Sequence, residues 1–115
     1  MNDLGFPRSR RLQKQYEFKR IYQAGHRETN RYLTVYTCPT GGRRGKAGIV
    51  AGKRLGKAVK RNRIRRALRE IVRHNQHRIL ESTDLIIIAK PPALNLPHHE
   101  LAEQLFQLLR KSGAM

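Results

Sequence analysis

One basic, amphipathic stretch, KAVKRNRIRRALREIVR from Lys57 to Arg73, most constrains how this chain can fold. At a helical period of about 100° per residue, its apolar residues gather on one side. Within about 80° of Ile64 lie Ala67, Leu68, Ile71, Val72, Asn75 and Ile79. We therefore predict a helix from about Ala58 to Leu80 whose apolar side packs on a core.

The opposite side of this predicted helix carries Arg66, Arg69 and Arg73, so it presents a column of guanidinium groups. A charged helix face is usually a solvated face, but solvated faces mix both signs because opposite charges four residues apart stabilise a helix. Here Arg65 and Arg69 repel each other instead, and cations also occupy the first turns, where the helix dipole disfavours them. A sequence that accepts these costs indicates an anionic partner.

The overall charge indicates that this partner is a polyanion. The formal net charge is +17 and the pI is about 11.4, and the basic residues concentrate between Arg43 and Arg73. A concentrated basic footprint is typical of nucleic-acid binding. The length suits one RNA-binding domain, 1–115, with a basic arm over residues 1–11, where glycine, proline and serine disfavour regular structure.

The single cysteine and the lack of long apolar runs limit the cellular setting. Cys38 alone excludes an internal disulfide and a zinc site built on cysteine pairs. No apolar run approaches the ~18 residues of a transmembrane helix, and the first residues lack the apolar core of a signal peptide. We therefore expect a protein of the reduced cytoplasm that does not bind membranes.

Shorter periodic segments flank the basic helix and predict a small α/β fold. Helices are expected at 12–24 and 98–111, and strands at 31–38, 47–51 and 84–90. Strand 84–90 is a continuous apolar run, which is typical of a strand buried on both faces. The order α-β-β-(β)-α-β-α indicates an α/β (α+β) two-layer sandwich whose helices pack on a sheet of three or four strands.

The chain carries no good catalytic set of its own. The segment from Gly52 to Lys57 departs from the Walker A pattern in its glycine spacing and in the residue after the lysine, which excludes nucleotide hydrolysis. Its cations at a helix start suit a backbone phosphate instead. His74 and His77 share a helix face, where a solvated or phosphate-facing pair is more common than a metal pair. We expect no catalytic residue, metal or cofactor on the protein.

An aromatic pair in the first predicted helix allows two interpretations. Phe18 and Tyr22 are four residues apart and share one helix face. Such a pair usually packs in a core, but it can also form a stacking surface for an unpaired base. The tyrosines of strand 31–38, including Tyr36, alternate with apolar residues and could line an open sheet face.

The motif Lys57-Ala-Val-Lys-Arg-Asn-Arg-Ile-Arg-Arg66 resembles the signature of the bacterial ribonuclease P protein subunit. The resemblance covers nearly the whole chain, including Glu17-Phe18, Tyr22 with Gly25, Tyr36, Gly48-Ile49-Val50 before Lys53-Arg54, and Asp84 to Pro91. It implies an accessory subunit of an endoribonuclease that removes the 5′ leader from precursor tRNA. The RNA subunit would carry the active site and its Mg²⁺, in a 1:1 complex with a monomeric protein. The resemblance also implies a left-handed β-α-β crossover.

The same resemblance implies two sets of RNA-binding residues. The set that binds the RNA subunit is Arg61, Asn62, Arg63, Arg65, Arg66 and Arg69. The set that binds the leader is Phe18, Tyr22, Tyr36, Lys53, Arg54 and Lys90. Two positions depart from the family pattern: Tyr22 stands where many members have Phe, and Pro91 stands where a second basic residue is common.

Two other functions share some of these features. A ribosomal-type structural protein that binds folded rRNA would have the same charge and sandwich, but it would not need the aromatic residues. A DNA-binding regulator could place the arginine helix in a major groove. It should then show a helix-turn-helix pair and a dimer face, and the sequence indicates neither.

Overall fold

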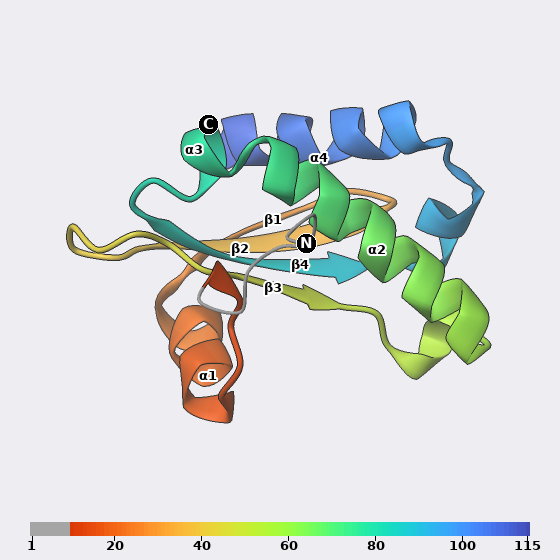
Figure 1. The fold of residues 1–115 in the computed structure, drawn as a ribbon, viewed down its shortest axis with the longest axis horizontal. Coiled ribbons are helices and arrows are strands. Elements are labelled where there is room, and N and C mark those ends of the chain that lie inside the picture. Colours follow the sequence, from red (N-terminus) through yellow and green to blue (C-terminus); the bar gives the residue numbers. More distant parts are fainter. Residues whose placement is uncertain (1–9) are drawn as a thin grey trace, which may run out of the picture.

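The computed structural model describes residues 10–115, which form a four-stranded mixed sheet with helices on both faces (Figure 1). The strands are β1 (His26–Thr29), β2 (Leu33–Pro39), β3 (Ala47–Val50) and β4 (Thr83–Ala89), in the order β1-β2-β4-β3. The helices are α1 (Gln15–Ala24), α2 (Ala58–His74), α3 (Gln76–Ile79) and α4 (His98–Ser112), with 3₁₀ turns η2 (Lys53–Leu55) and η3 (Pro91–Asn95). In Figure 1, α2 and α4 lie on one side of the sheet and α1 lies on the other. The predicted α+β fold is confirmed.

Strand β4 lies inside the sheet, antiparallel to β2 and parallel to β3. Its residues Leu85 and Ile87 are buried towards α2 and α4, and Ile86 is buried towards α1. The prediction of a strand buried on both faces is therefore confirmed. Because β3 and β4 are parallel neighbours, the chain must cross over between them, and α2 is that crossover. Its left hand stays an expectation from the family resemblance.

The apolar side of the basic stretch packs as predicted. From α2, the buried residues are Ile64, Leu68, Ile71 and Val72, and from α4 they are Leu101, Leu105, Leu108 and Leu109. These side chains form the larger core with one face of the sheet. A smaller cluster lies under α1 on the other face, where Leu12, Ile21, Cys38 and Ile86 are buried. Cys38 is thus a small buried strand residue.

The helix predicted from Ala58 to Leu80 is interrupted at Asn75, which was expected to lie within the helix. Asn75 has φ −121° and ψ 16°, outside the helical range. Its side-chain amide donates a hydrogen bond of 2.8 Å to the carbonyl oxygen of Ile71. Side chains that compete for backbone acceptors in this way favour a helix end. The chain resumes as the single turn α3, whose Ile79 still reaches the core.

The first helix begins at Gln15, three residues after the predicted start at residue 12. The carboxylate of Glu17 accepts hydrogen bonds from the backbone N–H groups of Gln13 (3.0 Å) and Lys14 (3.1 Å) and so caps the helix start. Leu12 lies outside the helix and donates its N–H to the carbonyl oxygen of Ala47 at 2.9 Å. Leu12 has the spacing of a helical residue, but it pairs with the edge strand β3 instead of joining the helix.

Strand β1 is the strand that the predicted order left optional, and it has no apolar pattern. Its residues are His-Arg-Glu-Thr, and all are exposed or half-buried. The strand forms through its pairing with β2, in which His26 lies opposite Thr37 and Thr29 opposite Thr34. Such a strand depends on its neighbour more than on its own sequence.

One buried carboxylate joins three parts of the chain. Asp84 at the start of β4 is fully buried, and it accepts hydrogen bonds from Arg20 of α1, Arg43 of the β2–β3 loop and the backbone N–H of Lys46. Burial on its own raises the pKa of Asp84, but Arg43, the Lys46 N–H and Arg20 outweigh burial and lower that pKa. The ionised carboxylate therefore holds α1 against the sheet.

We expect Glu17→Gln to lower the free energy of unfolding by about 1 kcal/mol at neutral pH, as the loss of a helix cap does. Partial burial on its own raises the pKa of Glu17, but the N–H groups of Gln13 and Lys14 and the Lys46 ammonium hold it at about 2, below the ordinary 4.5. The carboxylate therefore stabilises the fold fully above pH 4.5, and this stabilisation is lost as the pH falls towards 2.

Denaturant titrations of both proteins at neutral pH and at about pH 3 would measure this difference. The destabilisation should shrink at the lower pH. An equal difference at both pH values would contradict the assignment of the cap to the ionised carboxylate.

Candidate nucleic-acid interface

Three aromatic side chains from α1 and β2 form one continuous surface, here named the aromatic platform. The ring centroids of Phe18 and Tyr22 are 6.5 Å apart, and those of Tyr22 and Tyr36 are 4.9 Å apart at an interplanar angle of 90°. Tyr22 is 40% exposed, and the other two rings are partly buried. The structure therefore brings together the three aromatic residues singled out from the sequence, and it leaves ring surface accessible for stacking.

A glycine in β3 lets the platform lie close to the sheet. A Cβ atom added at Gly48 would meet the Phe18 ring at 2.6 Å and a methyl group of Leu12 at 3.1 Å. Real Cβ atoms do not tolerate such contacts, so a larger residue would displace the ring. A glycine inside a predicted strand marks such close approaches, and this signal was present in the sequence.

The platform borders a part of the sheet that α1 does not cover. Beneath α1, Cys38 and Ile86 are buried, whereas Tyr36, Val50 and Ile88 on the same face are only partly buried. This exposed part of the face is here named the open sheet face. It offers apolar surface beside the aromatic rings, which suits the faces of unstacked bases.

Lys90 lies just after β4, at one end of the open sheet face. Its ammonium donates to the hydroxyl of Thr29 at 2.7 Å and to the carbonyl oxygen of Asn30 at 2.5 Å, and the hydroxyls of Thr29 and Thr34 are 2.8 Å apart. Both partners are neutral oxygen atoms, so neither of them is an ion-pair partner of Lys90. It also fastens the β1–β2 turn to the end of β4, a structural role that the sequence did not indicate.

Lys53 and Arg54 are exposed on η2, which follows β3. Within residues 10–115, no hydrogen bond, ion pair or ring contact joins them or Lys90 to the aromatic platform. The predicted leader-binding set thus comprises a compact aromatic group and separate cations at the ends of β3 and β4.

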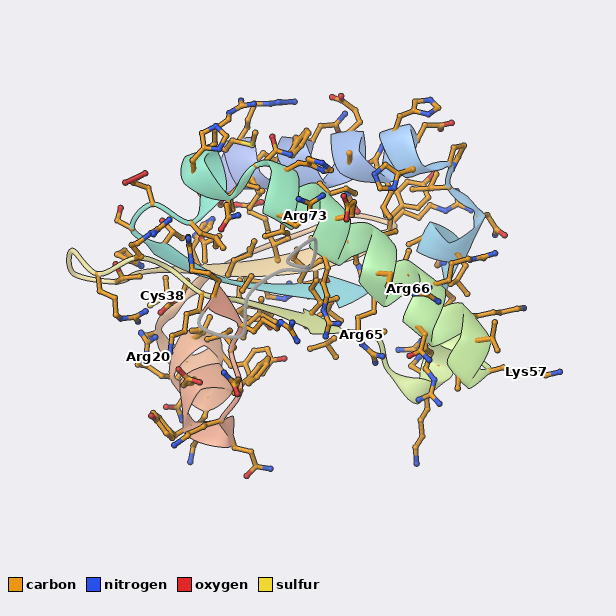
Figure 2. All side chains as sticks on the ribbon, viewed as in Figure 1. Arg20, Cys38, Lys57, Arg65, Arg66 and Arg73 are labelled. Carbon is orange, nitrogen blue, oxygen red and sulfur yellow. The ribbon has the colours of Figure 1, made fainter. Side chains whose placement is uncertain are left out.

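Five of the six arginines of α2 divide into two groups. Asn62, Arg65, Arg66 and Arg69 line one shallow depression, here named the arginine face. The Arg65 guanidinium donates to the Asn62 side-chain oxygen at 2.8 Å, so Asn62 orients Arg65. Figure 2 shows Arg65 and Arg66 along α2, with Lys57 at its N-terminal end.

Arg63 and Arg61 lie apart from the arginine face. The Arg63 guanidinium reaches the carbonyl oxygen of Leu94 in η3 at 3.4 Å, and Arg61 is half-buried. The three side chains of the Arg61-Asn62-Arg63 motif therefore point to different sides of the N-terminal end of α2.

The sequence placed Arg66, Arg69 and Arg73 pointing fully away from the core. Arg66 is exposed, but Arg69 and Arg73 are both half-buried, so the prediction was wrong for these two residues. Arg69 is half-buried and lines a pocket with Arg11 and Phe18 at the edge of β3. Burial, followed by the charges of Arg11 and Arg65, lowers the pKa of Arg69. The side chain is long enough to reach across the strand edge, so it joins the arginine face to the edge of the platform. The helical period of about 100° per residue predicts only the direction in which each Cβ atom points. It does not predict how far a long side chain such as that of Arg69 extends.

Residues 10 and 11 of the predicted arm are part of the fold, and residues 1–9 lie outside the described residues. Arg10 is buried, and its guanidinium donates to the carbonyl oxygens of Gly45 (3.1 Å) and Leu80 (3.3 Å) and to the side chain of Gln76 (3.0 Å). The sequence placed Arg10 in a basic arm without regular structure, because its partners come from segments far away in the chain.

The described chain shows neither a metal cluster nor a membrane span. From residue 10 onward, no three His, Cys, Asp or Glu side chains are grouped so that they could hold a metal ion. His74 pairs with Glu70 instead, at 3.4 Å, and His77 is exposed. In the same range, no helix is long and apolar enough to cross a membrane.

Known proteins of one family are similar to this chain in sequence and in structure. The family model described as Ribonuclease P matches residues 6–113. A ribonuclease P protein component from Staphylococcus aureus is 38% identical over 101 residues, which cover 87% of this chain and 87% of the relative. The structure of a mutant S. aureus RNase P protein matches with a TM-score of 0.86 at 34% identity, covering 93% of this chain and 91% of that chain. The RNase P protein from Thermotoga maritima matches with a TM-score of 0.78 at 28% identity, covering 88% and 96%. The chain belongs to the bacterial ribonuclease P protein family.

Proposed function

We propose that this chain is the protein component of ribonuclease P, which removes the 5′ leader from precursor tRNA by endonucleolytic cleavage. The arginine face binds the catalytic RNA, and the aromatic platform with the open sheet face binds the leader. The observation that carries this proposal is that two surfaces of different chemistry come from separate elements: guanidinium groups on α2, and aromatic rings on α1 and β2.

The aromatic platform suits a strand whose sequence varies. Leaders differ between precursors, so their binding site has to tolerate any base. Stacking on aromatic rings meets this need because every base has a π-face, and it contributes about 1–3 kcal/mol per base. The charges of Lys53, Arg54 and Lys90 would add backbone contacts that weaken as the salt concentration rises.

The arginine face suits a folded RNA. A structured RNA presents its phosphates as a fixed shape, which planar guanidinium groups bind with two parallel hydrogen bonds. In the described part of the chain, no ion pair involves Arg61, Arg63, Arg65 or Arg66, so their charge is available to a partner. The chemistry itself would come from the RNA and the Mg²⁺ that it binds. We propose a 1:1 complex with a monomeric protein in the cytoplasm.

The main alternative is a ribosomal-type protein that binds folded rRNA. It would use the arginine face in the same way, but it would have no use for three adjacent aromatic rings beside an open sheet face. The platform therefore favours the ribonuclease P role.

The direct test is reconstitution with a bacterial ribonuclease P RNA at a limiting Mg²⁺ concentration. We expect the protein to increase the rate of leader removal at least tenfold over the RNA alone, because it adds leader contacts and neutralises phosphates near the assembly. Gel-resolved cleavage of labelled precursor measures the rate. No increase in the rate would contradict the proposal.

Substitutions in the aromatic platform and in the arginine face should weaken different binding steps. Phe18→Ala should weaken holoenzyme binding of precursor tRNA roughly fivefold or more, and leave mature tRNA binding unchanged, because only the precursor has a leader. Arg66→Ala should mainly weaken assembly of the protein with the RNA subunit. Arg110→Ala on α4 removes the same charge elsewhere and serves as the control, for which we expect little change. Equal losses of precursor and mature tRNA affinity for Phe18→Ala would contradict the assignment of the leader to the platform.

A change in β3 should act on the platform indirectly. Gly48→Ala would place a Cβ atom 2.6 Å from the Phe18 ring and so displace it. We expect precursor affinity to fall roughly as far as with Phe18→Ala, while the aromatic side chain is still present. Gly52→Ala is the matched control, because Gly52 has φ −76° and its added Cβ meets nothing within 4 Å. If Gly48→Ala binds precursor as well as Gly52→Ala does, the ring position is not important for leader binding.

A further inference from the structure

The outer side of α1 extends the aromatic platform with side chains that the proposed function does not use. A shallow depression there is lined by Gln15, Tyr16, Phe18, Lys19, Tyr22 and Gln23. Tyr16 is 67% exposed, and in the described chain it is the most exposed aromatic residue. It begins the row Tyr16, Lys19 and Gln23, spaced three and four residues apart, so all three share one side of the helix.

This outer surface is continuous with the aromatic platform. Tyr22 contacts Tyr36 edge-on at 4.9 Å on the sheet side, and it also lines the outer depression. Phe18 likewise belongs to both. The aromatic rings therefore run from β2 to Tyr22 and Phe18, and the depression extends from these two rings past Lys19 to Tyr16.

The accessible charge around the depression is positive. Lys19 lines it and is exposed, and Lys14 at the start of α1 is also exposed. The acidic residue of α1, Glu17, turns inward, where it accepts hydrogen bonds at the helix start and pairs with Lys46 at 3.1 Å. Exposed aromatic rings, flexible cations and amides that can bond base edges are the groups that bind single-stranded nucleic acid. A second copy of this chain would bring the same positive charge and be repelled.

We propose that this depression is a second stacking site, which takes one or two leader nucleotides beyond those on the aromatic platform. Tyr16 stacks on a base, Lys19 contacts the adjoining phosphate, and Gln15 and Gln23 hydrogen-bond to base edges. The inference rests on the proposed function, since it needs a leader that already lies on Phe18 and Tyr22. It deepens that function by extending the length of leader that the protein contacts.

The test measures holoenzyme affinity for precursors whose leaders are shortened stepwise from about ten nucleotides to none. With the native protein, affinity should rise with leader length in two stages. Tyr16→Ala should abolish the second stage, so that long leaders bind roughly fivefold more weakly while short leaders and mature tRNA bind unchanged. Lys19→Gln should reduce the salt dependence of long-leader binding by about one ion. Tyr16→Phe keeps the ring and should behave as the native protein does.

Phe18→Ala, measured with the same series of leaders, distinguishes a failure of the second stacking site from a failure of leader binding on the aromatic platform. A loss of affinity at every leader length with Phe18→Ala, together with native behaviour of Tyr16→Ala, would overturn the second site and leave the platform intact. Native behaviour of both variants would overturn both. An equal loss for all lengths and for mature tRNA with Tyr16→Ala would overturn the stacking role of Tyr16. Tyr16 is exposed and alanine favours helices, so we expect its circular dichroism spectrum and unfolding midpoint to match those of the native protein.

Discussion

The burial of β4 between two unequal layers determines where everything else can lie. On one face, α2 and α4 cover the strand completely, and their leucine and isoleucine side chains form the larger core. On the other face, the short helix α1 covers only part of the sheet. Burial of apolar area, at about 25 cal/mol per Å², fixes both layers. The incomplete layer leaves aromatic and apolar surface exposed beside α1, and this surface is what a stacking site needs.

The charges of the chain also fall into two classes. Arg20, Arg43 and Lys46 are held by the two inward-facing carboxylates, Asp84 and Glu17, and they position α1 and the β2–β3 loop. The cations of the α2 start have no such acidic partners within residues 10–115. With a net charge of +17, the unneutralised cations repel one another and lower the stability of the free protein. A polyanion that binds them removes this cost, so the same residues that weaken the fold strengthen the complex.

Much of this arrangement could be predicted from the sequence, because it depends on periodic apolar patterns. The apolar stripe of α2, the doubly buried β4 and the leucine stripe of α4 all follow from spacing alone. The family motif added the identity of the platform, and the rings of Phe18, Tyr22 and Tyr36 do come together.

The errors arose where a contact that the apolar pattern does not encode outweighs that pattern. Strand β1 has no apolar residues and depends on pairing with β2. The break at Asn75 results from a side chain that binds a backbone carbonyl. The side chain of Arg69 lies over the edge of β3. The buried guanidinium of Arg10 donates hydrogen bonds to carbonyl oxygens of residues that lie 35 and 70 positions away in the chain. The contacts of β1, Arg69 and Arg10 leave no signal at their own positions in the sequence, whereas Asn75 is a residue type that favours a helix end.

Our proposed placement of the leader is on the α1 side of the sheet, away from Arg65 and Arg66 of α2. Photo-crosslinking tests it most directly, with thiouridine placed at single positions in the leader of a precursor bound to the holoenzyme. After digestion, this placement predicts RNA adducts on peptides from α1 and β2, which include Phe18, Tyr22 and Tyr36, and none on Arg65 or Arg66 of α2. Leader adducts on the arginine face, with none on α1 or β2, would contradict it.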